Sequence, residues 1–476
     1  MDHRKVDLNK VKNIHLMGVG GAGMSGLALL FHELGYHVTG CDMGRSSYIE
    51  KLEKAGVTVL YGHAVEHLKS CSTDLLAYSS AIPSDNAELA EARKCGIPVL
   101  QRAELLSLLF DSRKGIGVAG THGKTTTTSM ISYILELAGM NPTVAVGGEL
   151  CDIGCNAKIG AGEHMVAELD ESDGSFECFH PFYTVVTNVD WDHVNHYPTI
   201  QDVEEAFVRF LGNLKPGGHI FLCGEDAGIQ EVLRSVPEKL QGGISLYGFD
   251  PSYDFYATDV QYHCGGGLCY NFYAKGVCQG MVELVVSGRH NVLDSLAACA
   301  VSYILNVPFE AVQKALRMFH GAKRRLQLRG LCPENILVYD DYGHHPSEIE
   351  ATLDAVKTMY PDRRIILAFQ PHRFTRTQAL FGRFAQVLST VSRVVLLPIY
   401  AADEQPIPGV SSELISAEVI RLGGDCHPVS NKLEAAERVV SMARPGDLIL
   451  TEGAGDVCVV GDLVIQELNR CSASSL

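Results

Sequence analysis

Long apolar segments are absent from this 476-residue chain, which contains no run of about 18 apolar residues. Its beginning, MDHRKVDLNKVKNIHLMG, lacks the apolar core of a secretion signal. CxxC pairs are absent too: the 15 cysteines stand singly from Cys41 to Cys471. This pattern is typical of reduced thiols, and it argues against a disulfide framework or a zinc site. We therefore expect a cytoplasmic protein that is neither secreted nor inserted into a membrane.

Positive charge is in deficit, with 39 Lys and Arg against 56 Asp and Glu and a formal net charge of −17. Such a balance argues against a general nucleic-acid or anionic-membrane binder, while a local basic pocket for a small anion is still compatible with it. Hydrophobic residues at 46% and charged residues at 20% exclude disorder as the dominant state. The chain is too long for one core, so we expect several domains.

Strand and helix patterns alternate in three segments, without an internal repeat or a low-complexity tract. We predict three α/β domains, at residues 1–107, 108–322 and 323–476. The first is a Rossmann-like parallel sheet, the second a P-loop ATPase-like mixed sheet, and the third another Rossmann-like, doubly wound sheet. Within the second, Tyr253–Val286 is predicted as antiparallel strands with a glycine-rich turn at Gly265–Gly267.

The first predicted strand, Ile14–Met17, ends in a glycine-rich turn. Gly18, Gly20 and Gly23 fit the pattern G-x-G-x-x-G, and Asp42 lies 19 residues further on. Glycines at such a turn let the backbone approach a pyrophosphate at a helix N-terminus, with the acidic residue on a ribose. This motif alone leaves three alternatives open: an NAD-linked oxidoreductase, a binder of another diphosphate–ribose compound, or a purely structural turn.

A stronger signal follows the strand predicted at Gly115–Ala119. The loop Gly120-Thr121-His122-Gly123-Lys124-Thr125 opens a helix, although Val118 stands where the usual phosphate loop has its first glycine. Backbone N–H groups of such a loop hold phosphates, Lys124 would reach the β and γ oxygens, and a threonine hydroxyl suits Mg²⁺. A lysine at a helix N-terminus is unfavourable unless an anion meets it, so a purely structural loop explains this pattern poorly.

Carboxylates follow two buried-looking strands downstream, in Glu168–Asp173 (ELDESD) and in Asp190–His193 (DWDH). Each cluster alone is compatible with an ordinary polar loop. Their joint position after a phosphate loop favours the Mg²⁺ site of a nucleotide enzyme.

Three further loops carry polar side chains next to predicted helices. Gly288–Asn291 precedes one helix, and Asn291 could act as its N-cap. In the third segment, Asp340–Pro346 (DDYGHHP) and Gln370–Arg376 (QPHRFTR) each connect a strand to a helix. We expect these two loops to meet at the edge of a doubly wound sheet, where arginines would bind a carboxylate or a phosphate. Scattered surface polarity is the alternative explanation.

Together these motifs resemble the Mur ligases, in the order GVGGAGMSG, GTHGKTTTT, AELDESD, TNVDWDH, GRHN, DDYGHHP and QPHRFTRT over about residues 1–460. The resemblance implies an ATP-dependent ligase acting through an acyl phosphate in peptidoglycan stem-peptide synthesis. Within the family it is nearest to the branch that joins L-alanine to UDP-N-acetylmuramate. A ligase that adds a recycled tripeptide to the same muramate is the closer alternative, and an NAD-linked oxidoreductase or a non-catalytic nucleotide sensor are remote ones. The implied cofactors are ATP and Mg²⁺, with Mn²⁺ as a substitute; nucleic acid and membrane are not expected partners.

The resemblance also implies roles for individual residues. The uridine nucleotide would lie against Gly20, Ala22, Gly23, Asp42, His63 and Ser80. ATP would lie against Gly120, Thr121, His122, Gly123, Lys124, Thr125, Thr126, His290, Asn291, Arg325 and Asp341. The expected catalytic residues are Lys124, Glu168 and His193, and the expected metal ligands are Thr125, Glu168 and His193. The amino acid would meet Tyr342, His344, Arg373 and Arg376. The chain departs from the family pattern at Asn195 and Asp294, where Asp and Asn are frequent.

Overall fold

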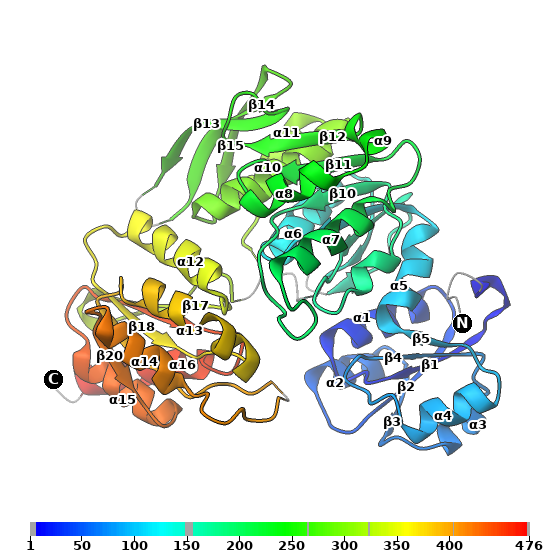
Figure 1. Cartoon of the computed structure of the whole chain (residues 1–476), viewed down its shortest axis with the longest axis horizontal. Helices are drawn as coiled ribbons and strands as arrows, with labels where there is room; N and C mark the ends of the chain where they lie inside the picture. The colour runs from blue at the N-terminus through cyan, green and yellow to red at the C-terminus, as the bar shows by residue number, and fades with distance from the viewer. Residues whose placement is uncertain (1–5, 148–155, 264–265, 322–323, 403, 474–476) are drawn as a thin grey trace.

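The computed structural model describes residues 6–147, 156–263, 266–321, 324–402 and 404–473. They form three α/β lobes, each built on one sheet, with the central lobe above the N-terminal and C-terminal lobes in the view of Figure 1. The predicted three-part α/β fold is thus confirmed. Among these residues, no helix is both long enough and apolar enough to span a membrane.

The N-terminal lobe contains a five-stranded parallel sheet in the order β3-β2-β1-β4-β5. Its strands are β1 (Asn13–Met17), β2 (His37–Asp42), β3 (Thr58–Tyr61), β4 (Leu75–Tyr78) and β5 (Val99–Gln101). The helices are α1 (Ala22–Glu33), α2 (Ser47–Lys54), α3 (Glu66–Ser70), α4 (Ala87–Lys94) and α5 (Arg102–Asp111), after the short 3-10 helix η2 (Leu8–Lys10). The sequence pattern missed β3, because this short edge strand is only partly buried and shows no clear alternation.

The central lobe contains a ten-stranded mixed sheet in the order β15-β14-β13-β12-β11-β10-β6-β9-β7-β8. Its strands are β6 (Lys114–Ala119), β7 (Thr143–Ala145), β8 (Ala157–Lys158), β9 (His164–Glu168), β10 (Tyr183–Val186), β11 (His219–Cys223), β12 (Ile244–Gly248), β13 (Phe255–Tyr262), β14 (Leu268–Ala274) and β15 (Val277–Leu284). The last three are antiparallel, as predicted. Gly266 and Gly267 of the predicted turn have positive φ angles, and Gly265 lies outside the described residues.

Helices of the central lobe flank the parallel part of this sheet. They are α6 (Lys124–Leu137), α7 (Ile200–Leu211), α8 (Ala227–Ser235), α9 (Glu238–Gln241), α10 (Arg289–Ile304) and α11 (Phe309–Met318), with the 3-10 helix η3 (Ser175–Cys178). The N-cap of α10 is Gly288, so the expectation that Asn291 caps this helix is wrong. Asn291 instead donates its side-chain N–H to the carbonyl of Ser287, 2.7 Å away.

The C-terminal lobe contains a six-stranded sheet in the order β16-β17-β21-β18-β19-β20, parallel except for β16. Its strands are β16 (Gln327–Cys332), β17 (Ile336–Asp341), β18 (Ile365–Phe369), β19 (Arg393–Leu396), β20 (Cys426–Pro428) and β21 (Leu448–Glu452). The helices are η4 (Pro333–Asn335), α12 (Pro346–Met359), α13 (Phe374–Leu388), α14 (Ser412–Arg421), α15 (Lys432–Met442) and α16 (Cys458–Ala473). Separate apolar clusters cover its two faces, as a doubly wound sheet requires.

One continuous apolar core extends from the N-terminal lobe into the central lobe, joining residues such as Ile14, Phe110 and Ile131. The C-terminal lobe has cores of its own and meets the central lobe through polar side chains and through Trp191, which packs against one of these cores. Because parallel strands end at the same edge of a sheet, the loops after β6, β9, β10, β17 and β18 come together where these two lobes meet.

Candidate active site

The loop between β6 and α6 depends on glycine at two positions. Gly120 has a φ of +134°, and a Cβ there would lie 2.1 Å from the Thr187 hydroxyl oxygen. Gly123 has a φ of +79°, and a Cβ there would lie 2.7 Å from Asp294 Oδ1. Asn188, after β10, accepts from the His122 N–H at 2.8 Å and donates to the His122 carbonyl at 2.9 Å. The loop is therefore held open at the N-terminus of α6, with a shape suited to phosphate.

Lys124 folds back over this loop. Its ammonium donates to the carbonyls of Gly120 (2.6 Å) and Thr121 (3.1 Å) and to Glu171 Oε2 (2.7 Å). Burial disfavours the charged form, yet the carboxylates of Glu171, Asp170 and Glu168 raise the pKa of Lys124. Burial raises the pKa of Glu171 to about 7, although Lys124 opposes that shift. The ammonium is thus kept charged and desolvated at the place where phosphate oxygens would enter.

Thr125 and Glu168 lie in contact, as expected of two metal ligands. The Thr125 hydroxyl donates to both carboxylate oxygens of Glu168, at 3.1 and 3.0 Å, and Glu168 also accepts from the Gly147 N–H at 2.9 Å. His193 lies instead beside Glu171 (3.6 Å) and Asp192 (3.7 Å). Burial lowers the pKa of His193 to about 4, which leaves a neutral imidazole. Oxygen donors of this kind fit Mg²⁺, and a neutral imidazole is able to ligate a metal.

His122 lies between two lobes. Its ring nitrogens are 3.5 Å from Asp190 Oδ2 and 3.4 Å from Glu348 Oε1, on α12. Burial opposes a charge on His122, but hydrogen bonds to Asp190 and Glu348 raise its pKa to about 9. His122, Asp190 and His345 form one of two groups in the described residues whose potential metal-ligand atoms all lie within 4.8 Å of one another.

A buried ion pair that the sequence did not suggest joins the central and C-terminal lobes. Arg376 makes two parallel bonds to Asp192, both of 2.9 Å, and these side chains are 4% and 5% exposed. The Ser347 hydroxyl adds a 2.7 Å bond to Asp190. Although burial raises it, the pKa of Asp192 is held well below its usual range, chiefly by the charge of Arg376. The guanidinium of Arg376 is therefore bound to Asp192 in this structure.

The other residues expected around the amino acid lie close to this ion pair. The ring of His344 is 5.6 Å from that of Tyr342 and 5.5 Å from that of His372. Arg373 has a backbone φ of +71°, which residues other than glycine rarely adopt. Its side-chain Nε has no hydrogen-bond partner among the described residues. Arg373 is thus the guanidinium of this loop with a donor left for a ligand.

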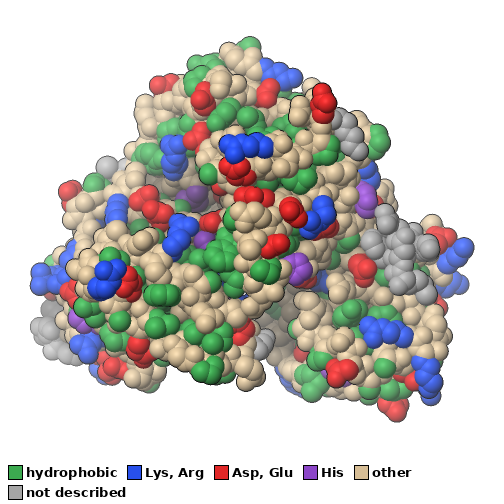
Figure 2. All heavy atoms as spheres, viewed as in Figure 1, with side chains coloured by type: hydrophobic (Ala, Val, Ile, Leu, Met, Phe, Trp, Pro, Cys, Tyr) green, Lys and Arg blue, Asp and Glu red, His purple; other side chains and the backbone are tan. Residues whose placement is uncertain are grey.

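A cavity of about 320 Å³ opens between these two lobes, with a volume suited to a small ligand. Figure 2 shows histidine side chains in the recess between the same lobes. Nine residues predicted for ATP or found beside them line the cavity: His122, Gly123, Thr126, His290, Asn291, Asp294, Arg325, Asp341 and Glu348. Burial and the charge of Arg325 lower the pKa of His290 to about 4. Asp341 is buried and accepts from the N–H groups of Leu326 and Gly343, so it shapes the turn beside this cavity.

A smaller cavity, of about 80 Å³, lies between the N-terminal glycine loop and the carboxylates of the central lobe. Ala22 and Gly23 line one side of it, and Glu168 and Asp170 line the other. Arg102, at the start of α5, also lines it and lies against Gly23. Sequence reasoning missed Arg102, because no motif surrounds it.

In the N-terminal lobe the predicted nucleotide contacts follow successive strand ends. Asp42, the last residue of β2, accepts from the Gly20 N–H (2.8 Å) and the Gly44 N–H (3.0 Å), and therefore shapes the glycine loop. His63 follows β3 with Nδ1 3.3 Å from Cys41 Sγ, and Ser80 is exposed after β4. The sequence analysis assigned no individual role to four other residues beside the candidate sites, all in recognised motifs or the helix after them: Glu171, Asn188, Asp192 and Glu348.

Comparison with known proteins agrees with the three lobes. The model "Mur ligase family, catalytic domain" matches residues 13–114, the Mur ligase middle domain matches 118–302, and the Mur ligase glutamate ligase domain matches 324–455. The chain is 42% identical to the UDP-N-acetylmuramate–L-alanine ligase of Carboxydothermus hydrogenoformans over 96% of this chain and 97% of that protein. It is also 42% identical to the enzyme of the same name from Syntrophobacter fumaroxidans, over 98% of each.

Solved structures give the same result. The UDP-N-acetylmuramate–alanine ligase of Thermotoga maritima superposes with a TM-score of 0.77 at 28% identity, covering 97% of this chain and 99% of that one. A murein peptide ligase from Psychrobacter arcticus superposes with a TM-score of 0.68 at 25% identity, covering 96% and 98%. Since family models match most of the chain and relatives share 42% of its residues over nearly the full length, the chain belongs to the Mur ligase family.

Proposed function

We propose that this chain is an ATP-dependent ligase that joins L-alanine to the carboxylate of UDP-N-acetylmuramate, with release of ADP and phosphate. The observation that carries the proposal is Lys124, a buried ammonium at a glycine-shaped helix N-terminus facing Glu171 and adjoining the Thr125–Glu168 pair. Relatives with 42% identity carry the name of that activity. The oxidoreductase alternative would leave this arrangement without a role, and it needs Asp42 for a ribose while both Asp42 oxygens accept from backbone N–H groups, those of Gly20 and Gly44.

In the proposed division of labour, residues 1–107 bind the uridine nucleotide, 108–322 bind ATP, and 323–476 bind the amino acid. The small cavity supports this division, because it places Ala22 and Gly23 opposite Glu168 and Asp170. A muramate carboxylate held on the N-terminal lobe would thus face the phosphate loop. Arg102, in the same cavity, offers a guanidinium to that carboxylate.

The proposed reaction has two steps. A muramate carboxylate oxygen attacks the γ-phosphorus of ATP, the bond to the β–γ bridging oxygen breaks, and ADP leaves. The amine of L-alanine then attacks the carbonyl carbon of the acyl phosphate, loses its proton, and inorganic phosphate leaves. The Lys124 ammonium stabilises charge on the transferring phosphoryl group, and positioning supplies much of the rest of the rate. The Arg376–Asp192 pair holds two lobes together, which helps to exclude water from the acyl phosphate.

We further propose that Thr125 and Glu168 hold Mg²⁺, or Mn²⁺ in its place, with His193 as a ligand nearby. When bound, the ion would neutralise phosphate charge. The ligand atoms that Thr125 and Glu168 offer are oxygens, and these oxygens are in contact with one another, which fits a hard cation. The reaction would take place in the cytoplasm, where ATP is available and the free cysteines of the described residues would stay reduced.

Isotope transfer tests the proposed chemistry. With ¹⁸O in the muramate carboxylate, one labelled oxygen should leave in each inorganic phosphate formed, provided that L-alanine is present. Phosphate release should be scanned with L-alanine, L-serine, glycine and a stem tripeptide in parallel. Unlabelled phosphate would contradict the acyl phosphate, and preference for the tripeptide would make the chain a recycling ligase.

A further inference from the structure

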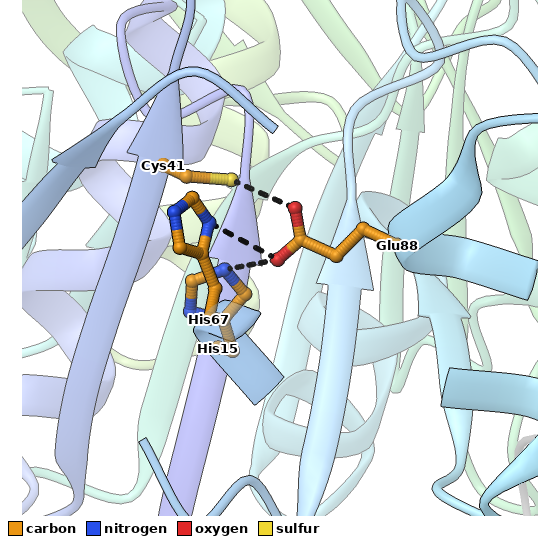
Figure 3. A group of neighbouring side chains, drawn as sticks. All are labelled: His15, Cys41, His67 and Glu88. Carbon is orange, nitrogen blue, oxygen red and sulfur yellow. Dashed lines mark hydrogen bonds and ion pairs between the residues drawn. The ribbon is translucent and has the colours of Figure 1, made fainter. Parts of the chain in front are cut away.

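A second cluster of ionisable side chains, far from the phosphate loop, has no part in the proposed reaction. His15 on β1, Cys41 on β2, His67 in α3 and Glu88 in α4 point toward one another inside the N-terminal lobe (Figure 3). Their potential ligand atoms all lie within 4.8 Å of one another. His15, Cys41 and Glu88 are completely buried, and the side chain of His67 is 13% exposed.

Three of the converging atoms of this cluster lack a hydrogen-bond partner, although the Cys41 thiol donates to Glu88 Oε2. His15 Nε2 is 3.0 Å and His67 Nδ1 is 3.5 Å from Glu88 Oε1, and Cys41 Sγ is 3.8 Å from Glu88 Oε2. Neither of these nitrogens nor Glu88 Oε1 has a hydrogen-bond partner of acceptable geometry among the described residues. Buried polar atoms are nearly always partnered, and an ion is one of the few explanations for a group that is not.

The surroundings of His15 favour a metal ligand. Its other nitrogen, Nδ1, lies 2.8 Å from the hydroxyl of Thr39, to which it can donate its proton. In a neutral ring, donation in this direction directs the lone pair of Nε2 at Glu88 Oε1, 3.0 Å away, and either a proton on Nε2 or a bound cation would then relieve the repulsion between the two atoms. Histidine ligands usually donate their second ring N–H to an oxygen in this way.

We propose that His15, Cys41, His67 and Glu88 form a closed binding site for a divalent metal ion of the zinc class. Two imidazoles, a thiolate and a carboxylate are the ligand types of tetrahedral Zn²⁺, and its bond lengths place ligand atoms roughly 3.3 to 3.8 Å apart. Two of the separations in the structure, 3.5 and 3.8 Å, lie in this interval, and the separation of His15 Nε2 from Glu88 Oε1 is shorter, at 3.0 Å. The ligands come from four separate elements, which explains why the cysteine spacing argued against a zinc site.

The site would be structural and would support the uridine-nucleotide side of the N-terminal lobe. Cys41 directly precedes Asp42, which shapes the glycine loop, and His63 Nδ1 lies 3.3 Å from Cys41 Sγ. The Ala64 N–H donates to Glu88 Oε2 at 3.2 Å. A metal ion would therefore connect β1, β2, α3 and α4 immediately behind the predicted nucleotide contacts.

Metal content of the full chain tests the proposal independently of activity. The protein is stripped with a chelator, exposed to Zn²⁺ with Mg²⁺ in excess, and desalted. We expect one retained Zn²⁺ per chain, and at least tenfold less in Cys41→Ser and in His67→Gln. Replacing Zn²⁺ with Co²⁺ should give tetrahedral d–d bands and a thiolate charge-transfer band, and Cys41→Ser should remove the latter.

Cys223→Ser is the matched control, because Cys223 is a buried cysteine that lines the larger cavity. It should keep both the zinc and the charge-transfer band. Zn²⁺ should also raise the melting temperature of the parent and of Cys223→Ser, and not that of folded His67→Gln. A parent that retains no metal, or unchanged zinc in both Cys41→Ser and His67→Gln, would overturn the proposal and leave a buried imidazolium–carboxylate pair.

Discussion

The two glycine loops of this chain share a position in the fold and differ in charge. Each follows a parallel strand and leads into a helix N-terminus, β1 into α1 and β6 into α6. In the N-terminal loop the ionisable neighbour is Asp42, whose carboxylate accepts from backbone N–H groups. In the central loop it is Lys124, whose ammonium donates to two carbonyls and to Glu171.

This difference in charge distinguishes a loop that only binds a diphosphate from a loop that also takes part in phosphoryl transfer. A loop shaped by a carboxylate presents backbone N–H groups and helix dipole to a diphosphate, but it carries no ammonium of its own. A loop with a buried ammonium adds a full positive charge, which can stabilise charge that develops during phosphoryl transfer. The glycine pattern therefore predicts the shape of each loop. The charge of the ionisable side chain beside the loop indicates whether the loop can stabilise a reacting phosphoryl group.

The largest effect should come from removing the cation of the central loop. Lys124→Ala should lower kcat by at least about 10²-fold, the usual loss for one preorganised stabilising group. Phosphate release under saturating substrates measures it. Lys114→Ala, at the start of the same strand in an exposed pair with Glu163, should change little. Near-normal turnover in Lys124→Ala would contradict this comparison, because neither loop would then supply a cation that the reaction needs.

The next effect extends the comparison to the C-terminal lobe, where two arginines of one loop are expected to differ. Arg376→Lys loses the two parallel bonds to Asp192, so kcat/KM should fall about tenfold for all substrates, or roughly 1.4 kcal/mol. Adding Asp192→Asn should cost little more, because the pair acts as a unit. Arg373→Lys should instead raise the KM for L-alanine about tenfold. If Arg376→Lys raises the KM for L-alanine alone, Arg376 contacts the amino acid.

A smaller effect is expected from the carboxylate of the N-terminal loop. Asp42→Asn keeps the size of the side chain but can accept well at only one of the two N–H groups, from Gly20 or Gly44. Losing one charge-assisted bond should raise the KM for UDP-N-acetylmuramate roughly tenfold or less and leave kcat nearly unchanged. Steady-state kinetics measures both constants. A large fall in kcat would show that this loop, too, takes part in the chemistry.

The smallest effect concerns the stability of the central loop. Burial raises the pKa of Asp294 to about 7 from an ordinary value near 3.8, and the Thr127 hydroxyl, 3.0 Å away, and Arg325 offset part of that shift. The folded state therefore holds a proton that the unfolded state has lost, so stability should fall as the pH rises from about 4 to 7. Asp294→Asn should flatten this dependence and be more stable than the parent at pH 8.

Urea unfolding of the central lobe at pH 5 and pH 8 measures the difference. The exposed Asp354→Asn is the matched control, and its stability should keep the pH dependence of the parent. An Asp294→Asn curve parallel to that of the parent would mean that Asp294 stays ionised in the fold.

Sequence alone determined the three-part α/β organisation and the phosphate loop. Apolar runs predicted β1 at Ile14–Met17 and β6 at Gly115–Ala119, and each strand begins one residue earlier in the structure. Glycine loops can be read in this way because they depend on residues that are neighbours in the chain. Conversely, β3 was missed, and Asn291 was offered as a cap that Gly288 supplies.

Only the tertiary structure decided which side chains meet. Arg376 and Asp192 lie on different lobes, as do His122 and Glu348, and His15, Cys41, His67 and Glu88 come from four separate elements. These contacts depend on how sheets and lobes pack, so the spacing of residues along the chain carries no signal for them. The chemistry of the phosphate loop is local in sequence, whereas the partners that hold each charge in place are brought together by folding.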